Sequence, residues 1–217
     1  MRFADRLAEA FAQGEPLSTL PPGDRPADEA AAWAVQDAVL DSLGFAACGL
    51  RLVRGMDGSW ISGPVLEGRL VASGSVVPLS AFHHPRVSAG VLLSLRSDVE
   101  RPDALTRALG ALHPVLDLAD SRYAEGPPDA LWQAADLAGL GMIAVGPPRR
   151  ATKAALRAAG SGFDLEALLR RGIDDAGGLP AGAILLIASL SDHFAPEAGE
   201  VLTGDVPGAG TLKITVA

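Results

Sequence analysis

From Gly49 onward the sequence is a series of short apolar runs separated by glycine and proline. This pattern limits the possible folds more than any other feature of the sequence. Short runs bounded by turn-forming residues are typical of strands. The last run, 210–216, alternates polar and apolar side chains with a period of two, as a half-exposed strand does. The pattern predicts a β-rich body with strands at 49–54, 64–71, 75–79, 87–95, 111–118, 140–145, 183–189 and 210–216.

The first 48 residues have a different, helical pattern. A helix is expected over 2–13, because Gly14 and Pro16 then stop it. A second helix is expected from about 26 to 43, where apolar residues recur every four positions and Gly44 follows. Shorter helices are expected at 102–110, 128–138, 150–159 and 164–175.

These elements predict an α+β protein, with an N-terminal helical segment (1–48) followed by a β-rich body (49–217) that together form one structural unit. A doubly wound sheet is disfavoured, because strands and helices do not alternate regularly and the sequence has no Gly-x-Gly-x-x-Gly motif.

The charge and composition argue against several classes of partner. The net charge is −8 and basic residues cluster only in arginine pairs, which disfavours nucleic-acid binding. No apolar run approaches the roughly 18 residues of a membrane span. The N-terminus lacks the apolar stretch of a signal peptide, and the single cysteine, Cys48, excludes an intramolecular disulfide. A cytoplasmic protein is expected.

Several short motifs follow one another in a recognisable order, and the most specific is Pro114-x-x-Asp117-x-x-Asp120-Ser121-Arg122. In this order the motifs resemble the 2-keto-4-pentenoate hydratase and 4-oxalocrotonate decarboxylase group of the fumarylacetoacetate hydrolase superfamily. The resemblance covers nearly the whole chain and implies a mixed β-roll core behind N-terminal helices. The other motifs are Trp33 with Gln36, Gly49–Val53, Gly68–Leu70, Gly74–Pro78, Ser88–Gly90, Leu179–Gly182, Ser189–Ser191 and Gly199–Glu200.

The resemblance implies a small 2-oxo acid as substrate and Mg²⁺ or Mn²⁺ as cofactor. Three carboxylates hold the cation in the family, and the cation stabilises the enolate of a chelated 2-oxo acid. Here the ligand positions fall on Ser88, Gly90 and Asp117, and the position of an assisting lysine falls on Arg51. Asp117 is the only candidate metal ligand retained, because residues 86–97 contain no Asp or Glu. The sequence therefore predicts a degraded metal site.

By the same resemblance, the candidate catalytic residues are Arg51, Asp117 and Ser189. The candidate substrate-binding residues are Arg51, Arg122, Ser88 and Ser189, because an arginine can bind a carboxylate through two hydrogen bonds. We expect Ser88, Gly90, Asp117, Arg51 and Ser189 to line one pocket at the mouth of the β-rich core.

Two functional interpretations follow from these residues. The first is a divergent enzyme of the hydro-lyase or decarboxylase type that acts on or binds a small 2-oxo acid. The alternative is a non-catalytic homologue, either a partner subunit or a small-anion binding module built on Arg51 and Arg122. The family implies an oligomer, either of this chain alone or with an active homologue.

Two further arrangements of histidine are open in the sequence. His83 and His84 could join Asp117 at a softer metal such as Zn²⁺. His193 could pair with Ser189 or Ser191 for hydrolysis, although the sequence has no Gly-x-Ser-x-Gly elbow.

Overall fold

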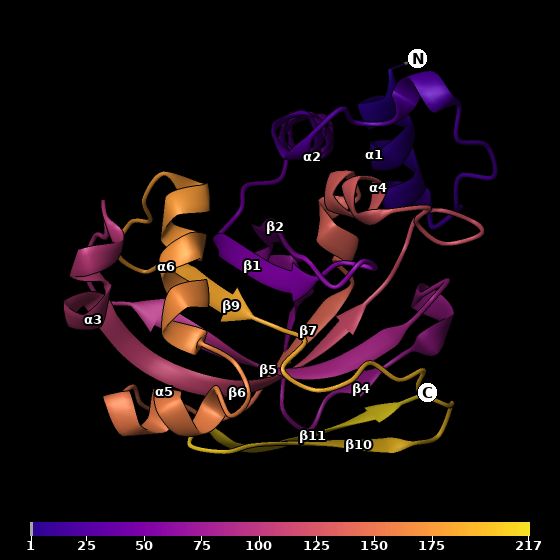
Figure 1. Ribbon diagram of the computed structural model, residues 1–217. Coiled ribbons are helices and arrows are strands. Elements are labelled where there is room, and N and C mark those ends of the chain that lie inside the picture. The colour runs from indigo at the N-terminus through magenta and orange to yellow at the C-terminus, as the bar shows by residue number, and fades with distance from the viewer. Residues whose placement is uncertain (1) are drawn as a thin grey trace.

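A strongly curved sheet forms the centre of the computed structural model, which describes residues 2–217 (Figure 1). Most helices lie over one side of this sheet, whereas a small second sheet and the helix at 153–159 lie at the other. The helices are α1 (Phe3–Gln13), α2 (Glu29–Leu43), α3 (Leu105–Ala108), α4 (Ala130–Ala135), α5 (Lys153–Ala159) and α6 (Leu165–Ala176). The strands are β1 (Gly49–Arg54), β2 (Trp60–Val65), β3 (Leu70–Ala72), β4 (Val76–Val77), β5 (Arg86–Leu95), β6 (Leu109–Ala119), β7 (Met142–Val145), β8 (Arg149–Arg150), β9 (Ile184–Ile187), β10 (Val201–Val206) and β11 (Gly210–Val216).

The large sheet has eight strands, in the order β2-β1-β9-β5-β6-β7-β3 with β8 paired to β6. The sheet is mixed: β1 pairs with β9 in parallel, whereas β5 pairs with both β9 and β6 in antiparallel fashion. The small sheet has the order β10-β11-β4. This is the α+β architecture with a mixed β-rich core that the sequence predicts.

The expected strand at 64–71 is wrong, because it joins the end of one strand to the start of another. β2 ends at Val65, a short 3-10 turn occupies Glu67–Arg69, and β3 begins at Leu70. Strand β2 was missed because Gly63 and Pro64 interrupt its apolar pattern. Proline is tolerated there because β2 is an edge strand, so Pro64 needs no partner for the N–H it lacks.

Strand β10 was also missed, although it alternates exposed and buried residues. Gly204 lies in its middle, and a Cβ there would lie 2.6 Å from a side-chain carbon of Leu212 and 3.1 Å from Leu116. This glycine therefore marks a close approach of the small sheet to the large one, and not a turn.

The helices begin where their caps are. The Asp28 carboxylate accepts a hydrogen bond from the N–H of Ala31, so α2 begins at Glu29 and not at 26. The helix expected over 102–110 is shorter in the structure, Leu105–Ala108, because β6 begins at Leu109.

None of the described helices is long and apolar enough to cross a bilayer.

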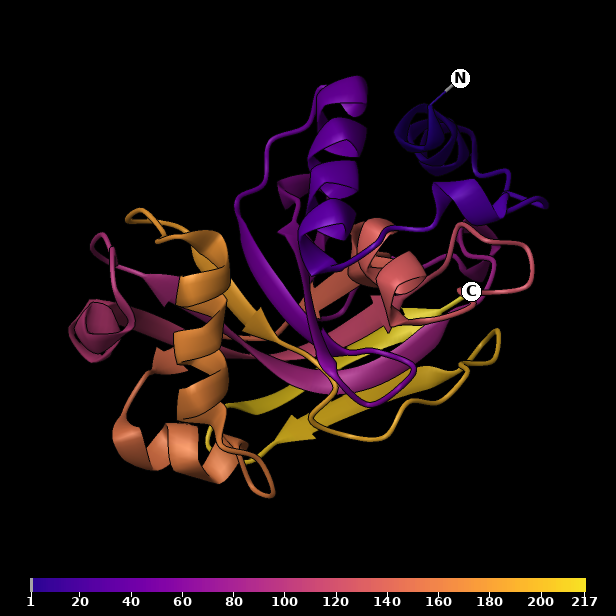
Figure 2. The same cartoon turned by 45° about the horizontal axis from the view of Figure 1, so that its top comes forward.

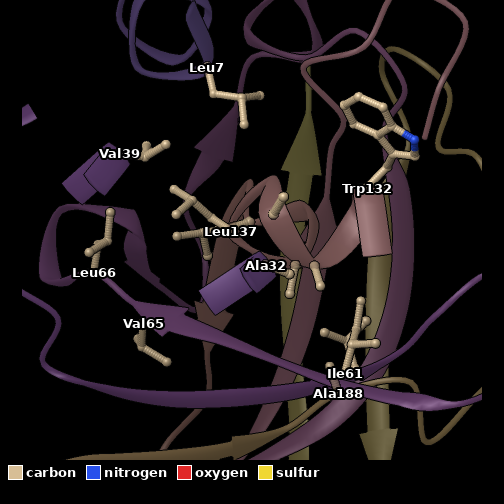
Figure 3. Packing of buried hydrophobic residues seen from close by; sticks show 14 of the residues in the cluster. Leu7, Ala32, Val39, Ile61, Val65, Leu66, Trp132, Leu137 and Ala188 are labelled. Carbon is tan, nitrogen blue, oxygen red and sulfur yellow. The ribbon is translucent and has the colours of Figure 1, made fainter. Parts of the chain in front are cut away.

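The N-terminal helices and the sheet share one hydrophobic cluster. Leu7 of α1, Val39 of α2, Ile61 of β2 and Trp132 of α4 are all buried in it (Figure 3). Helices α1 and α2 lie side by side over this cluster in both views of the ribbon (Figures 1 and 2). The buried Gln36 side chain of α2 ties this layer to the body, because it donates to the carbonyls of Ser62 and Ala134.

Candidate functional site

The register of β5 and β6 brings the expected ligand positions together. Ser88 pairs with Asp117 across the two strands, and Gly90 pairs with Val115. Ser88 and Asp117 are both fully buried. The alignment of the two motifs is therefore consistent with the structure, but these residues lie beneath the surface and not on the wall of an open pocket.

The carboxylate of Asp117 is held by Arg51 in a buried ion pair. Arg51 Nε donates to Oδ1 at 2.9 Å and Nη2 donates to Oδ2 at 2.6 Å, and neither side chain is exposed. Arg51 Nη1 donates to the carbonyl of Ala138 at 2.8 Å. Ala138 and the preceding Leu137 both have positive φ values, 52° and 50°, so a strained turn directs this carbonyl at the guanidinium.

The neighbouring positions offer no second carboxylate. A Cβ on Gly90 would lie 2.4 Å from the carbonyl oxygen of Ile187, so the backbone of β9 excludes a side chain there. The Ser88 hydroxyl accepts the N–H of Ser189 at 3.1 Å. Within residues 2–217, no three His, Cys, Asp or Glu side chains gather in a way that could hold a metal ion. The residues at the positions where the sequence resemblance places the metal ligands therefore do not fit Mg²⁺ or Mn²⁺, which need several oxygen ligands.

Arg122 is also paired internally. Its Nε donates to Asp136 Oδ1 at 2.6 Å, and its Nη atoms donate to the carbonyls of Leu140 and Asp136. The side chain is 6% exposed. Burial raises the pKa of the Asp136 carboxyl to about 6, because loss of water outweighs the attraction of Arg122. Arg51 and Arg122 thus do not form the pair of free, cavity-facing arginines that the anion-binding module requires.

The histidines near β5 are not arranged around Asp117. The backbone N–H groups of His83 and His84 both donate to Asp120 Oδ1, and the His84 ring bonds the carbonyl of Ala124. Asp120 therefore orders this turn through a carboxylate that accepts two backbone hydrogen bonds. The predicted Zn²⁺ arrangement of His83, His84 and Asp117 is not formed, since Arg51 occupies both oxygens of Asp117.

Ser189 and His193 form a hydrogen-bonded pair beside this buried layer. Ser189 Oγ lies 3.0 Å from His193 Nε2 and also accepts the N–H of Arg54 at 3.2 Å. Ser189 is 2% exposed and has a φ of 55°, whereas His193 is exposed. The pKa of His193 is lowered, mainly because burial penalises its charged form and also by the charges of Arg51, Arg86 and Arg54, against the opposing charge of Asp117.

His193 lies on the wall of a cavity of about 550 Å³ that opens beside the buried ion pair. The opposite walls come from the β1–β2 connection, the start of β5, the end of β6 and the segment 125–139. Its polar lining residues are Arg54, Arg86, His84, Gln133 and Ser121, together with the acidic residues Asp120, Glu125 and Asp136. Asp120 and Asp136 are already engaged, since Asp120 accepts the N–H groups of His83 and His84 and Asp136 is paired with Arg122.

Neither Arg54 nor Arg86 forms an ion pair with any residue of 2–217. The Arg54 guanidinium lies over the rings of Phe163 and Trp60, at 5.0 and 5.8 Å from their centroids. Arg86 is the exposed first residue of β5 and makes no side-chain hydrogen bond in the described chain. Arg86 is not among the residues that the sequence predicts for the site. The available signal was its position between the His83-His84-Pro85 turn and the expected strand at 87–95.

The fold is shared with solved structures of the kind that the sequence resemblance implies. The 4-oxalocrotonate decarboxylase from Pseudomonas putida G7, complexed with magnesium and adipate, has a TM-score of 0.82 at 19% identity, over 99% of this chain and 97% of that chain. The same enzyme complexed with calcium and acetate has a TM-score of 0.79 at 18% identity, over 99% and 97% of the two chains.

More distant structures share a smaller part of the fold. The 2-hydroxyhepta-2,4-diene-1,7-dioate isomerase from Mycobacterium marinum has a TM-score of 0.55 at 14% identity, over 80% of this chain and 76% of that chain. No protein-family model matches the sequence, and a search of curated proteins finds no match. At these identities the likeness shows the fold, and function rests on the residues of the site.

Proposed function

We propose that this protein binds a small 2-oxo acid, or a related carboxylate, in the cavity beside β5 without a divalent metal. The observation that carries the proposal is Arg86, which lies on the wall of that cavity with His193 and has no ion-pair partner within residues 2–217. An unpaired guanidinium beside a neutral imidazole suits an anionic oxygen. Two structures with a similar fold support the proposal, because these 4-oxalocrotonate decarboxylase structures are complexes with the carboxylates adipate and acetate.

The buried pair of Arg51 and Asp117 is the reason for proposing binding without metal. A cation shared by Asp117 and a bound 2-oxo acid would lie near a guanidinium that already occupies both carboxylate oxygens. The positive charge of Arg51 would repel the ion, and no other carboxylate compensates at Ser88 or Gly90. We infer that Arg51 stands as a fixed internal cation in the region where the family holds its metal.

Calorimetric titration in the presence of EDTA tests the proposal. Adipate, pyruvate and 2-oxoadipate are titrated into the wild type, Arg86→Ala and Arg101→Ala. Arg101 is an exposed arginine outside the cavity and serves as the matched control. We expect at least one of these acids to bind, and Arg86→Ala to weaken it about tenfold or more, because charge-assisted hydrogen bonds contribute about 1.5–3 kcal/mol. Equal affinities for the two variants would refute the role of Arg86.

The alternative of a partner subunit stays a prediction with its own measurement. Light scattering of the purified chain, alone and mixed with an active hydratase or decarboxylase of this fold, would detect such an assembly. A stable mixed complex, together with absence of carboxylate binding, would favour the partner subunit over the binding protein.

A further inference from the structure

The hydrogen bonds of the Ser189 hydroxyl decide how His193 is protonated. A serine hydroxyl has one proton to donate. Ser189 Oγ accepts a hydrogen bond from the backbone N–H of Arg54, and its remaining partner in the described structure is His193 Nε2 at 3.0 Å. If the hydroxyl proton is to be used in this buried position, Nε2 must accept it. The neutral imidazole then carries its own proton on Nδ1.

Ser189 is held in the conformation that makes this bond. Its φ of 55° is unfavourable for a residue with a side chain. Two hydrogen bonds to β5 hold this conformation: the N–H of Ser189 donates to the Ser88 hydroxyl at 3.1 Å, and the N–H of the following Leu190 donates to the carbonyl of Ala89. Ser88, at a position where the family has a metal ligand, thus helps to fix Ser189.

We propose that Ser189 holds His193 in the Nδ1–H tautomer, so that the imidazole presents an N–H donor to an anionic oxygen of a carboxylate bound in the cavity. The two ring nitrogens are separated by one carbon and point in different directions. Nδ1 has no hydrogen-bond partner within residues 2–217 and His193 is exposed, so this nitrogen is available to a ligand. This inference rests on the proposed function and adds a ligand-binding residue, His193, and a positioning residue, Ser189.

The charges around His193 favour this neutral donor. Arg51, Arg54 and Arg86 oppose a positive charge on the ring, and Asp117 favours one but is neutralised by Arg51. Ser189 acts through His193 and not as a nucleophile, since at 2% exposure its oxygen is covered from the cavity. The cationic Arg86 and the neutral N–H of His193 would together bind two oxygens of one carboxylate, or a carboxylate and a 2-oxo group.

Nitrogen NMR of the histidine rings tests the tautomer directly. At pH 7.5 we expect the wild type to show His193 in the Nδ1–H form. In Ser189→Gly we expect a shift towards the Nε2–H form, which predominates for free histidine; glycine accepts the positive φ, so this variant keeps the backbone. Ser191→Ala is the matched control, because Ser191 lies in the same segment and bonds Ala89 N and Asp192 O instead of the ring. An Nε2–H ring in the wild type would overturn the inference.

Calorimetric titration with the carboxylate tests whether the Nδ1–H group of His193 donates to the ligand. Asn at 193 places its amide nitrogen near the Nδ1 position, whereas Gln places it near Nε2. We expect His193→Asn to bind the carboxylate within about twofold of the wild type, and His193→Gln to bind about five- to tenfold more weakly, as expected for one lost hydrogen bond.

Failure of this inference and failure of the proposed function give different results. If Arg86→Ala weakens binding and both His193 variants bind as the wild type does, the proposed function stands and the donor role of His193 is wrong. If the wild type binds none of the acids, the proposed function and the donor role are both wrong, and the NMR spectrum still decides the tautomer.

Discussion

Replacing Arg51 with methionine should destabilise the fold severely, because it leaves the carboxylate of Asp117 buried without a counter-charge. Both side chains are fully enclosed, and three hydrogen bonds at 2.6–2.9 Å disappear. Removing one partner of a buried pair costs about 3–5 kcal/mol. Since the whole fold is stable by about 5–15 kcal/mol, Arg51→Met should lose a large part of its free energy of unfolding.

The double variant Arg51→Met with Asp117→Leu separates the charge effect from simple loss of packing. A buried ion pair can often be replaced by apolar residues of similar volume at no net cost. We therefore expect the double variant to be more stable than either single variant by about 2 kcal/mol or more. Urea unfolding, followed by tryptophan fluorescence, measures the free energy of unfolding of the wild type, the two single variants and the double variant.

The exposed pair of Arg170 and Glu166 supplies the control for this cycle. Its side chains are 44% and 63% exposed, so Arg170→Met should cost less than about 0.5 kcal/mol. If Arg51→Met and Asp117→Leu each cost less than about 1 kcal/mol, the two residues are not a desolvated pair, and the account of the site is wrong.

Three further predictions concern the surroundings of this pair. Gly90→Ala should cost about 1–3 kcal/mol in urea unfolding, because the new Cβ would meet the carbonyl of Ile187, whereas Gly68→Ala has open space and should cost little; equal losses would refute the close contact. Asp120→Ala should cost about 1–3 kcal/mol, since the N–H groups of His83 and His84 lose their acceptor, and a neutral result would show that water replaces it. The lowered pKa of His193 means that the unfolded chain binds the proton more readily, so this residue's contribution to stability is complete above about pH 6.5 and is lost as the pH falls towards the folded-state pKa. The stability of the wild type relative to His193→Asn should therefore fall between pH 7 and pH 5, and a constant difference would contradict the lowered pKa.

The sequence predicts the strands that carry the site because their patterns are local. The apolar runs at 49–54 and 87–95 become β1 and β5, and the register of β5 and β6 places Ser88 opposite Asp117, a pairing that the motifs alone do not specify. The buried ion pair of Arg51 and Asp117 could not be predicted from local sequence patterns. β1 and β6 are separated in the large sheet by β9 and β5, so the contact depends on the curvature of the whole sheet.

The cavity was harder to predict than the buried layer. Arg86 is an ordinary exposed arginine by its sequence, and its importance comes from the absence of an ion-pair partner within residues 2–217 and from its place on the cavity wall. The pairing of Ser189 with His193 was open in the sequence as a hydrolytic arrangement. The burial and the positive φ of Ser189, which no sequence pattern indicates, instead favour a positioning role.

We expect carboxylate binding in this cavity to need no divalent metal, because Arg51 already neutralises Asp117. The most direct test is a pair of calorimetric titrations of the same 2-oxo acid into the metal-stripped protein, one in EDTA and one with millimolar Mg²⁺ or Mn²⁺. We expect the same Kd in both. Binding that appears only with the metal, with one ion bound per chain, would contradict this expectation and would show that ligands other than Ser88 and Gly90 complete a metal site with Asp117.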